Sequence, residues 1–187
     1  MPAKFELSKF TKQARKVLER AQNLAQRLKH QHVEVEHVVL AMLEDDDGLG
    51  AATLQKVGVD TKALGRDLID ELELMPKTYK RSEQVFVGKK LLGALQAARD
   101  EAKRSEDQFA NSDHLLIAIV EDGSGFAAKR MKKEGATVEA LRDALEESRG
   151  GKPITSPEGP VPEILQKYAE DLTKMAAEGE LDPVIGR

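Results

Sequence analysis

The chain has 187 residues, of which 33% are charged and 4% are aromatic, and it carries a formal net charge of −4 with no cysteine. This composition is typical of a helix-rich soluble protein, because sheets use more β-branched and aromatic residues. It excludes a disulfide framework, and acids and bases alternate without the basic stripe that binds nucleic acid. No apolar run is long enough for a signal peptide or a membrane span, so we expect a cytoplasmic protein.

An internal repeat organises the chain. Residues 10–70 align without gaps with residues 87–147, an offset that relates His37 to His114. About 17 of about 61 paired positions are identical, and most of these are small or apolar, as expected for a duplicated unit. We predict an all-α fold of two pseudo-symmetric four-helix repeats, over about residues 8–73 and 84–149. A chain of this length can bury one large core or two small ones.

Each repeat is predicted to open with a long amphipathic helix. In the first repeat, apolar residues recur at helical spacing over residues 10–28, and Ser8 is the expected N-cap. In the second repeat, the corresponding helix begins at Ser82 or Gly88. The sequence therefore predicts one buried face on each of these helices.

The next helix of each repeat is almost entirely apolar. It covers residues 38–43 in the first repeat and 115–120 in the second, and it is too short to span a membrane. We predict that it forms the buried centre of its repeat. A third and a fourth helix follow, and the residues expected to break the chain or to cap the fourth helix are Gly48, Gly125, Asp60 and Thr137.

Two segments are predicted to be connections. Residues 74–84 join the repeats, since Pro76 ends the fourth helix and polar residues follow it. Residues 151–161 are rich in Gly, Pro and Ser, and we expect them to form a flexible tether after a globular domain over residues 1–150. The remaining residues, 162–187, begin with one further amphipathic helix, whose apolar face has no partner within the tail.

Several motifs resemble the N-terminal domain of the Clp-type AAA+ unfoldases. They are FTKQARKVL at residues 10–18, the paired Glu36-His37 and Asp113-His114, KYAEDLT at residues 167–173 and LDPVIGR at residues 181–187. The resemblance covers nearly the whole chain and is stronger to the ClpB disaggregases than to ClpC and ClpA. It implies that residues 162–187 begin the first ATPase domain of a larger homohexameric machine that uses ATP and magnesium.

We expect no catalysis by this chain itself. It contains no Gly-x-x-x-x-Gly-Lys-Ser/Thr phosphate loop, and no nucleophile stands in a pattern with a base. The run Asp45-Asp46-Asp47-Gly48 lacks the spacing of a calcium loop, because the twelfth position is Lys56 instead of glutamate. We therefore predict neither catalytic residues nor a metal or cofactor held by this chain.

The histidines are interpreted as structural. His37 and His114 lie a whole repeat apart, which makes a weak set of metal ligands, and we expect them to bond to nearby backbone. His30 and His32 do not share a helical face, and we expect both to be exposed to solvent.

The candidate substrate-binding residues are Thr11, Glu36, Asp107 and Asp113. Glu36 and Asp113 are predicted at helix starts, where a carboxylate can cap amides, and capping alone would explain them. The family resemblance implies instead that these two acids border the groove where peptide or cationic groups dock. It places Thr11 and Asp107 on the same contact surface, although Thr11 fits equally well as a residue of the first helical turn.

Two functions remain open from the sequence. The leading hypothesis is a domain that binds unfolded or aggregated polypeptide, or an adaptor protein that carries it, for threading by a hexameric ATPase ring. The alternative is a passive regulatory cap or spacer of that ring that does not contact substrate. We expect the isolated chain to be a monomer, with neither nucleic acid nor membrane as a partner.

Overall fold

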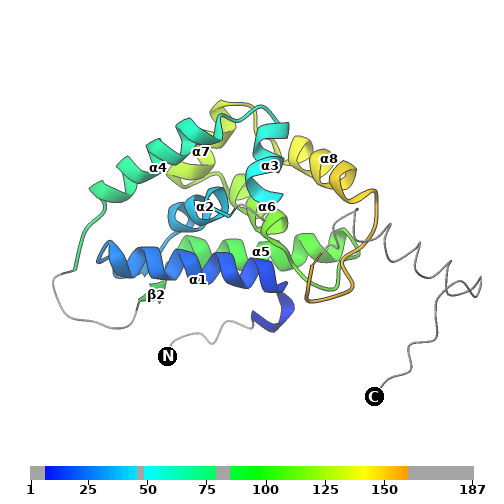
Figure 1. Ribbon diagram of the computed structural model, residues 1–187, viewed down its shortest axis with the longest axis horizontal. Helices are drawn as coiled ribbons and strands as arrows, with labels where there is room; N and C mark the ends of the chain where they lie inside the picture. The colour runs from blue at the N-terminus through cyan, green and yellow to red at the C-terminus, as the bar shows by residue number, and fades with distance from the viewer. Residues whose placement is uncertain (1–6, 46–48, 79–84, 160–187) are drawn as a thin grey trace, which may run out of the picture.

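The computed structural model describes residues 7–45, 49–78 and 85–159, which are almost entirely helical (Figure 1). The first repeat contains the 3-10 turn η1 (Leu7–Lys9), α1 (Lys12–Arg27), strand β1 (His32–Val33), α2 (Val35–Leu43), α3 (Leu49–Lys56) and α4 (Thr61–Leu74). The second contains strand β2 (Phe86–Val87), α5 (Lys89–Arg104), α6 (Ser112–Asp122), α7 (Phe126–Lys133) and α8 (Val138–Arg149). Each repeat thus contributes four α-helices, which confirms the predicted fold class.

Helices α2 and α6 form the centre of the molecule, as predicted from their apolar sequences. Every residue of α2 from Val35 to Met42 is buried, and so is every residue of α6 from Ser112 to Val120. The long helices α1 and α5 cover one side of this pair, while the shorter helices cover the other (Figure 1). Buried apolar side chains from both repeats join in one continuous cluster, so the chain has one large core.

Most helix starts follow the local capping signals. The Asp60 carboxylate accepts hydrogen bonds from two amides in the first turn of α4, and the Thr137 hydroxyl accepts one from the amide of Ala140 at 3.1 Å. Both residues are the predicted N-caps. Gly88 is the N-cap of α5 and Gly125 that of α7.

The start of α1 differs from the prediction. The N-cap is Thr11, whose hydroxyl accepts the amide of Ala14 at 3.2 Å, whereas Ser8 lies inside η1. The physical reason is a contact between residues far apart in the sequence. Phe10 forms a parallel bridge with Ala110, which keeps the chain extended between η1 and α1, so that the helix begins only after Thr11.

Two short parallel pairings interlock the repeats. In the first pairing, β1 and β2 align Val33 with Val87; in the second, Phe10 aligns with Ala110. The repeat offset relates one pairing to the other. In each, the segment that enters the first helix of one repeat pairs with the segment that enters the second helix of the other. These exchanged segments join the two repeats around the single core that they share.

The chain returns to the domain after α8. Gly150 and Gly151 adopt positive φ angles of 59° and 71°, which glycine tolerates and which turn the backbone back. Ile154 is buried, its carbonyl accepts the amide of Gln108 at 2.9 Å, and its own amide donates to the carboxylate of Asp107.

The docked segment continues to the start of α1. The carbonyl of Pro157 accepts the amide of Lys12 at 2.6 Å, and the side chains of Lys12 and Glu158 form an ion pair at 2.6 Å. These contacts lie beyond residue 150, where the sequence predicts the end of the globular domain and the start of a tether. Apolar burial and backbone hydrogen bonds hold residues 152–158, which composition alone did not indicate. The helix predicted after residue 162 lies outside the described residues.

Candidate functional site

Three of the four predicted site residues meet in one buried polar network between the starts of α1 and α6. Thr11, Asp107 and Asp113 are 0%, 6% and 1% exposed. The Thr11 hydroxyl donates to Oδ1 of Asn111 at 2.8 Å, and Nδ2 of Asn111 donates to Oδ2 of Asp113 at 3.0 Å. Asn111 is the N-cap of α6, so it connects the start of one repeat to the central helix of the other.

Arg149, in the last turn of α8, connects the two acids of this network. Its guanidinium donates to Oδ2 of Asp107, and its Nη2 lies 3.9 Å from Oδ2 of Asp113. Nε2 of His114 lies 2.9 Å from the same oxygen of Asp107. The buried guanidinium of Arg149 thus faces two buried carboxyl groups, and its removal would leave buried charge without compensation, which is destabilising.

The two acids differ in their affinity for protons. Burial favours the neutral form of Asp107, but hydrogen bonds from His114 and the Ile154 amide, together with Arg149, outweigh it and hold the pKa of Asp107 below its ordinary value. Burial dominates at Asp113 and raises its pKa despite the opposing effect of Arg149. Asp107 is therefore the principal ion-pair partner of the arginine.

Glu36 lies apart from this network. It is the second residue of α2 and 5% exposed, and its Oε1 accepts the amide of Ala127 in the first turn of α7 at 3.4 Å. It therefore caps a helix of the other repeat. Gly125 makes this possible, because a Cβ at that position would lie 2.9 Å from Oε1 of Glu36.

Asp113, the equivalent acid of the second repeat, also contacts a helix of the first repeat. Oδ1 of Asp113 accepts the hydroxyl of Thr53, in α3, at 3.3 Å. Each acid thus contacts the third helix of the opposite repeat. The N-caps of α2 and α6 themselves are Glu34 and Asn111, so neither predicted acid caps its own helix. All four predicted site residues are buried, and a ligand that contacts them directly must displace a protein partner.

His37 and His114 have the structural role predicted for them. Nδ1 of His37 accepts the amide of Glu34 at 3.0 Å, and Nδ1 of His114 accepts the amide of Asn111 at 2.9 Å. Each imidazole thereby completes the first turn of its buried helix, in the position that glutamate holds in a capping box.

The prediction of an exposed His30 is wrong, whereas His32 is exposed as expected. Nδ1 of His30 shares a hydrogen bond of 2.8 Å with Nε2 of His37. Lys29 has a left-handed φ of 61°, which ends the helical path of α1 and turns His30 inward. A non-glycine residue in this conformation has no clear sequence signal.

No group of three or more His, Cys, Asp or Glu residues within the described part of the chain could hold a metal ion. Asp45, the described member of the acidic run, is instead buried and pairs with Nη1 of Arg20 at 2.6 Å. None of the helices within residues 7–45, 49–78 and 85–159 is long and apolar enough to cross a membrane.

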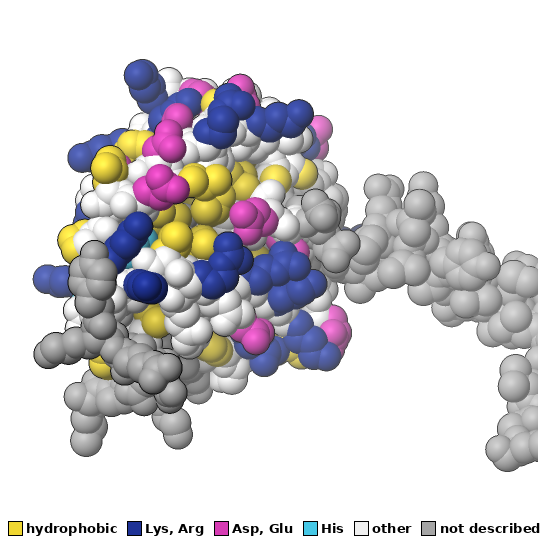
Figure 2. Space-filling model, turned by 60° about the vertical axis from the view of Figure 1, so that its left-hand side comes forward, with side chains coloured by type: hydrophobic (Ala, Val, Ile, Leu, Met, Phe, Trp, Pro, Cys, Tyr) yellow, Lys and Arg dark blue, Asp and Glu magenta, His cyan; other side chains and the backbone are white. Residues whose placement is uncertain are grey.

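Two surface features accompany the buried network. A pocket of about 420 Å³ opens beside it, lined by Lys9, by Arg99 and Lys103 of α5 and by loop residues 107–110. At the other end of the domain, hydrophobic side chains gather on the surface between acidic and basic ones (Figure 2). The large hydrophobic residues exposed on α4 and β2 are Ile69, Leu74, Phe86 and Val87.

Sequence reasoning missed two members of the network. Asn111 carries a signal that could have found it, because asparagine directly before an apolar helical run is a favoured N-cap. Arg149 carries none. It is one of several charged residues in a helix that reads as exposed, and only the packing of α8 against α6 brings it to the acids.

Comparisons with known proteins agree with this architecture. The chain matches the model of the Clp repeat (R) N-terminal domain over residues 9–134 and again over residues 89–178. The chaperone ClpB 1 of Parasynechococcus marenigrum is 37% identical over 180 residues, which are 95% of this chain and 20% of that protein. ClpB of Bdellovibrio bacteriovorus is 32% identical over 179 residues, which are 95% of this chain and 21% of that protein. The chain therefore spans about a fifth of the length of the curated relatives it matches.

Solved structures share the fold. The Hsp104 N-terminal domain from Candida albicans has a TM-score of 0.70 at 20% identity, covering 82% of this chain and 99% of that one. A ClpV N-domain in complex with a VipB peptide has a TM-score of 0.63 at 17% identity, covering 75% of this chain and 86% of that one. The family model, which spans both interlocked repeats, and the identity with the ClpB chaperones show that the chain belongs to the family of Clp repeat N-terminal domains.

Proposed function

We propose that this domain binds unfolded or aggregated polypeptide, or an adaptor protein that carries it, for an ATP-dependent disaggregase or unfoldase. The observation that carries the proposal is the exposed apolar surface of α4 and β2, which includes Leu74, Phe86 and Val87. Exposed apolar side chains gathered on a domain with a closed core are typical of protein interaction sites. The ClpV N-domain solved with a VipB peptide supports peptide binding by this fold.

The proposal extends to the protein of which this chain would be a part. The relatives are about five times as long as the chain, and the chain itself has no phosphate loop. ATP and magnesium would be bound by an ATPase region of the parent protein, assembled as a cytoplasmic homohexamer. The domain described here would supply binding and no catalysis.

Glu36 and Asp113 are proposed as subsites for cationic groups on a client, with Thr11 and Asp107 holding the surrounding structure. The geometry supports this because each acid has a long hydrogen bond that a ligand could replace: 3.4 Å from the Ala127 amide to Glu36, and 3.3 Å from the Thr53 hydroxyl to Asp113. Such bonds are weaker than those near 2.9 Å, and guanidinium is the best geometric match for a carboxylate.

A titration followed by NMR tests the proposed function. An unfolded casein, added to the labelled domain, should shift the amide signals of Ile69, Phe86 and Val87. The variant Phe86→Ser with Val87→Ser should weaken binding about tenfold, since it removes apolar contact area. Leu7→Ser is the matched control, because Leu7 is also exposed but lies in η1, and it should leave the affinity unchanged.

The titration and a deletion together test the alternative function. A passive cap or spacer would show no NMR shifts with unfolded chains or adaptors. Removal of such a domain from the parent protein would change basal ATPase activity without changing disaggregation. For the acidic subsites, Glu36→Gln should reduce affinity for Arg-rich peptides at low salt. Unchanged affinity with a lowered melting temperature would assign Glu36 to capping alone.

A further inference from the structure

The pocket beside the buried network has a charge opposite to that expected of the binding surface. The sequence suggested an acidic rim for cationic groups, but three basic residues, Lys9, Arg99 and Lys103, line this pocket. Lys9 and Lys103 are exposed, so their ammonium groups can reach a ligand at its mouth. The pocket is therefore a separate feature from the proposed acidic subsites.

Asp107 and Asp100 lie near the pocket, but they leave its two lysines able to bind a ligand. Asp107 faces inward, where its carboxylate is held by Arg149, His114 and the amide of Ile154. Asp100 pairs with Lys103 at 2.9 Å, but both side chains are mostly exposed. Surface pairs of this kind contribute little, and a ligand carboxylate can compete for the lysine.

The pocket also has an apolar component, and a backbone hydrogen bond joins two of its sides. Half-buried Phe109 and the buried Ala110 contribute to its lining. The amide of Ala110 donates to the carbonyl of Lys9 at 2.8 Å, which joins the two sides of the pocket. A volume of about 420 Å³ suits a few side chains of a peptide.

We propose that this pocket binds acidic peptide segments, with carboxylates near Lys9, Arg99 and Lys103 and a neighbouring apolar side chain against Phe109. The inference rests on the proposed function and names a chemical class of client or adaptor segment. A peptide is favoured over nucleic acid because the positive charge is confined to one pocket on a chain with a net charge of −4, without a stripe that could follow a phosphate backbone.

The test uses the full chain and a short fluorescent peptide that alternates Glu and Leu. Its anisotropy should report binding that is stronger than for the same peptide with Lys in place of Glu, and the amide signals of Phe109 and Ala110 should shift. The double variant Lys9→Glu with Lys103→Glu should weaken binding of the acidic peptide at least about tenfold.

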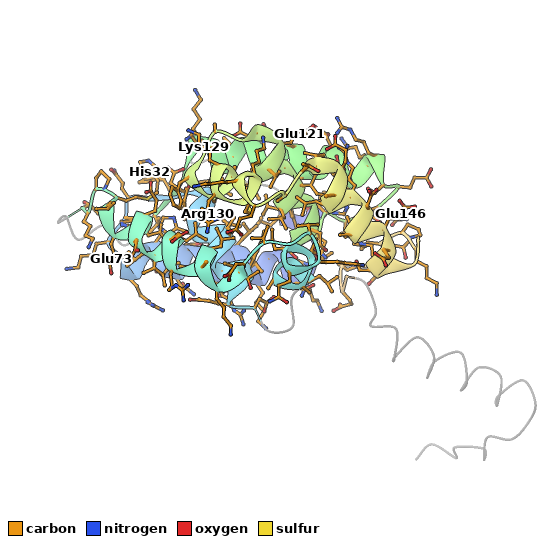
Figure 3. All side chains as sticks on the ribbon, turned by 90° about the horizontal axis from the view of Figure 1, so that it is seen from above. His32, Glu73, Glu121, Lys129, Arg130 and Glu146 are labelled. Carbon is orange, nitrogen blue, oxygen red and sulfur yellow. The ribbon has the colours of Figure 1, made fainter. Side chains whose placement is uncertain are left out.

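The control variant is Lys129→Glu with Lys133→Glu, which makes the same change of net charge on α7. Both lysines are exposed. Figure 3 shows Lys129 on α7 away from Glu146, which lies in the last turns of α8, near the end of the domain that contains the pocket. The control should bind the acidic peptide within about twofold of the original chain, since distant surface charges are screened. Equal effects of the two double variants, or equal binding of the Glu and Lys peptides, would overturn the proposal.

Unfolded casein separates this inference from the proposed function. If casein binds to α4 and β2 while the charge reversal leaves acidic-peptide binding unchanged, the pocket inference fails and the function stands. If casein and adaptors do not bind but the acidic peptide binds and is lost on charge reversal, the pocket is supported and the proposed function fails.

Discussion

The two ends of the domain are built from the same repeat but differ in their chemistry. The repeat offset relates His30, His37 and Leu72 at one end to Asp107, His114 and Arg149 at the other. The first and third of these pairs differ in residue type, and the histidine that both ends share has a different partner at each end. The backbone geometry is shared, since Lys29 and Glu106 both adopt left-handed φ angles near 60° and both turn the next side chain inward. The resulting contacts are 2.8 Å between the two imidazoles and 2.9 Å between carboxylate and imidazole.

The two ends differ in charge and in whether the segment after α8 docks against them. The Asp107 end contains an ionic network closed by Arg149, and residues 152–158 dock against it. The His30 end contains a pair of imidazoles, and His30 contacts the backbone of Leu72, the residue that corresponds to Arg149. Phe86 and Val87 are exposed on the neighbouring strand. Duplication thus preserves the backbone turn and the cap, while single side chains decide whether an end is ionic or neutral.

Removal of Arg149 should have the largest effect on this comparison. Arg149→Met leaves the buried carboxylates of Asp107 and Asp113 without their cation, and we expect a loss of about 3–5 kcal/mol in the free energy of unfolding. Urea unfolding at neutral pH measures it. At the other end, Leu72→Met keeps an apolar side chain and should cost less than about 1.5 kcal/mol. Similar losses for the two variants would show that the ionic network contributes no more than packing.

The neutral end should make the protein sensitive to acid. Burial and the neighbouring His30 lower the pKa of His37 to about 4, and burial lowers that of His30 as well. The unfolded chain, with an ordinary histidine pKa of 6.5, binds protons before the folded chain does as the pH falls. The free energy of unfolding should therefore decrease from about pH 6.5 to about pH 4, by up to roughly 3 kcal/mol for His37.

Two substitutions sharpen this prediction. His37→Gln keeps a side chain that can accept the Glu34 amide but cannot titrate, so it should flatten the dependence of stability on pH between 6.5 and 4. His32→Gln, at the exposed histidine, should leave the dependence unchanged. An unaltered pH profile in His37→Gln would contradict the assignment of the acid sensitivity to the imidazole pair.

Removal of the threonine N-caps should have a smaller effect on the free energy of unfolding, and the loss should be greater at the buried Thr11 than at the exposed Thr137. Thr11→Ala loses the cap of α1 and the hydrogen bond to Asn111, and it should cost about 2 kcal/mol. Thr137→Ala loses only the cap of α8, which is exposed, and should cost about 1 kcal/mol or less. Thermal or urea unfolding compares them directly, and a larger loss at Thr137 would contradict the role given to the buried network.

The smallest effect is expected at a surface contact between the repeats. Lys56 of α3 pairs with Glu147 of α8 at 2.6 Å, but the Lys56 side chain is 40% exposed and that of Glu147 is 72% exposed. Lys56→Gln should therefore lower the free energy of unfolding by about 0.5 kcal/mol or less. A loss above about 1 kcal/mol would mean that the ion pair, in addition to the shared core, holds the repeats together.

Much of the fold could be predicted from the sequence because its signals are local or repeated. The apolar period predicted the long helices, Asp60 and Thr137 predicted the starts of α4 and α8, and the repeat itself predicted four helices in each half. The structural role of His37 and His114 also follows from their place in the first turn of an apolar helix. The caps depend on residues within about one helical turn, the long helices on a period along one segment, and the count of helices on the duplication of that pattern.

Only the tertiary structure decided how the halves combine and where the site residues lie. The bridge from Phe10 to Ala110 sets where α1 begins, and Ile154 is buried against one end of the domain. The packing of α8 places Arg149 beside Asp107 and Asp113. These contacts join residues far apart in the chain, whose pairing depends on the whole core, so no local pattern encodes them. That is the physical reason why the sequence determined the helices and their caps, and tertiary packing determined the buried network, the basic pocket and the exposed apolar end.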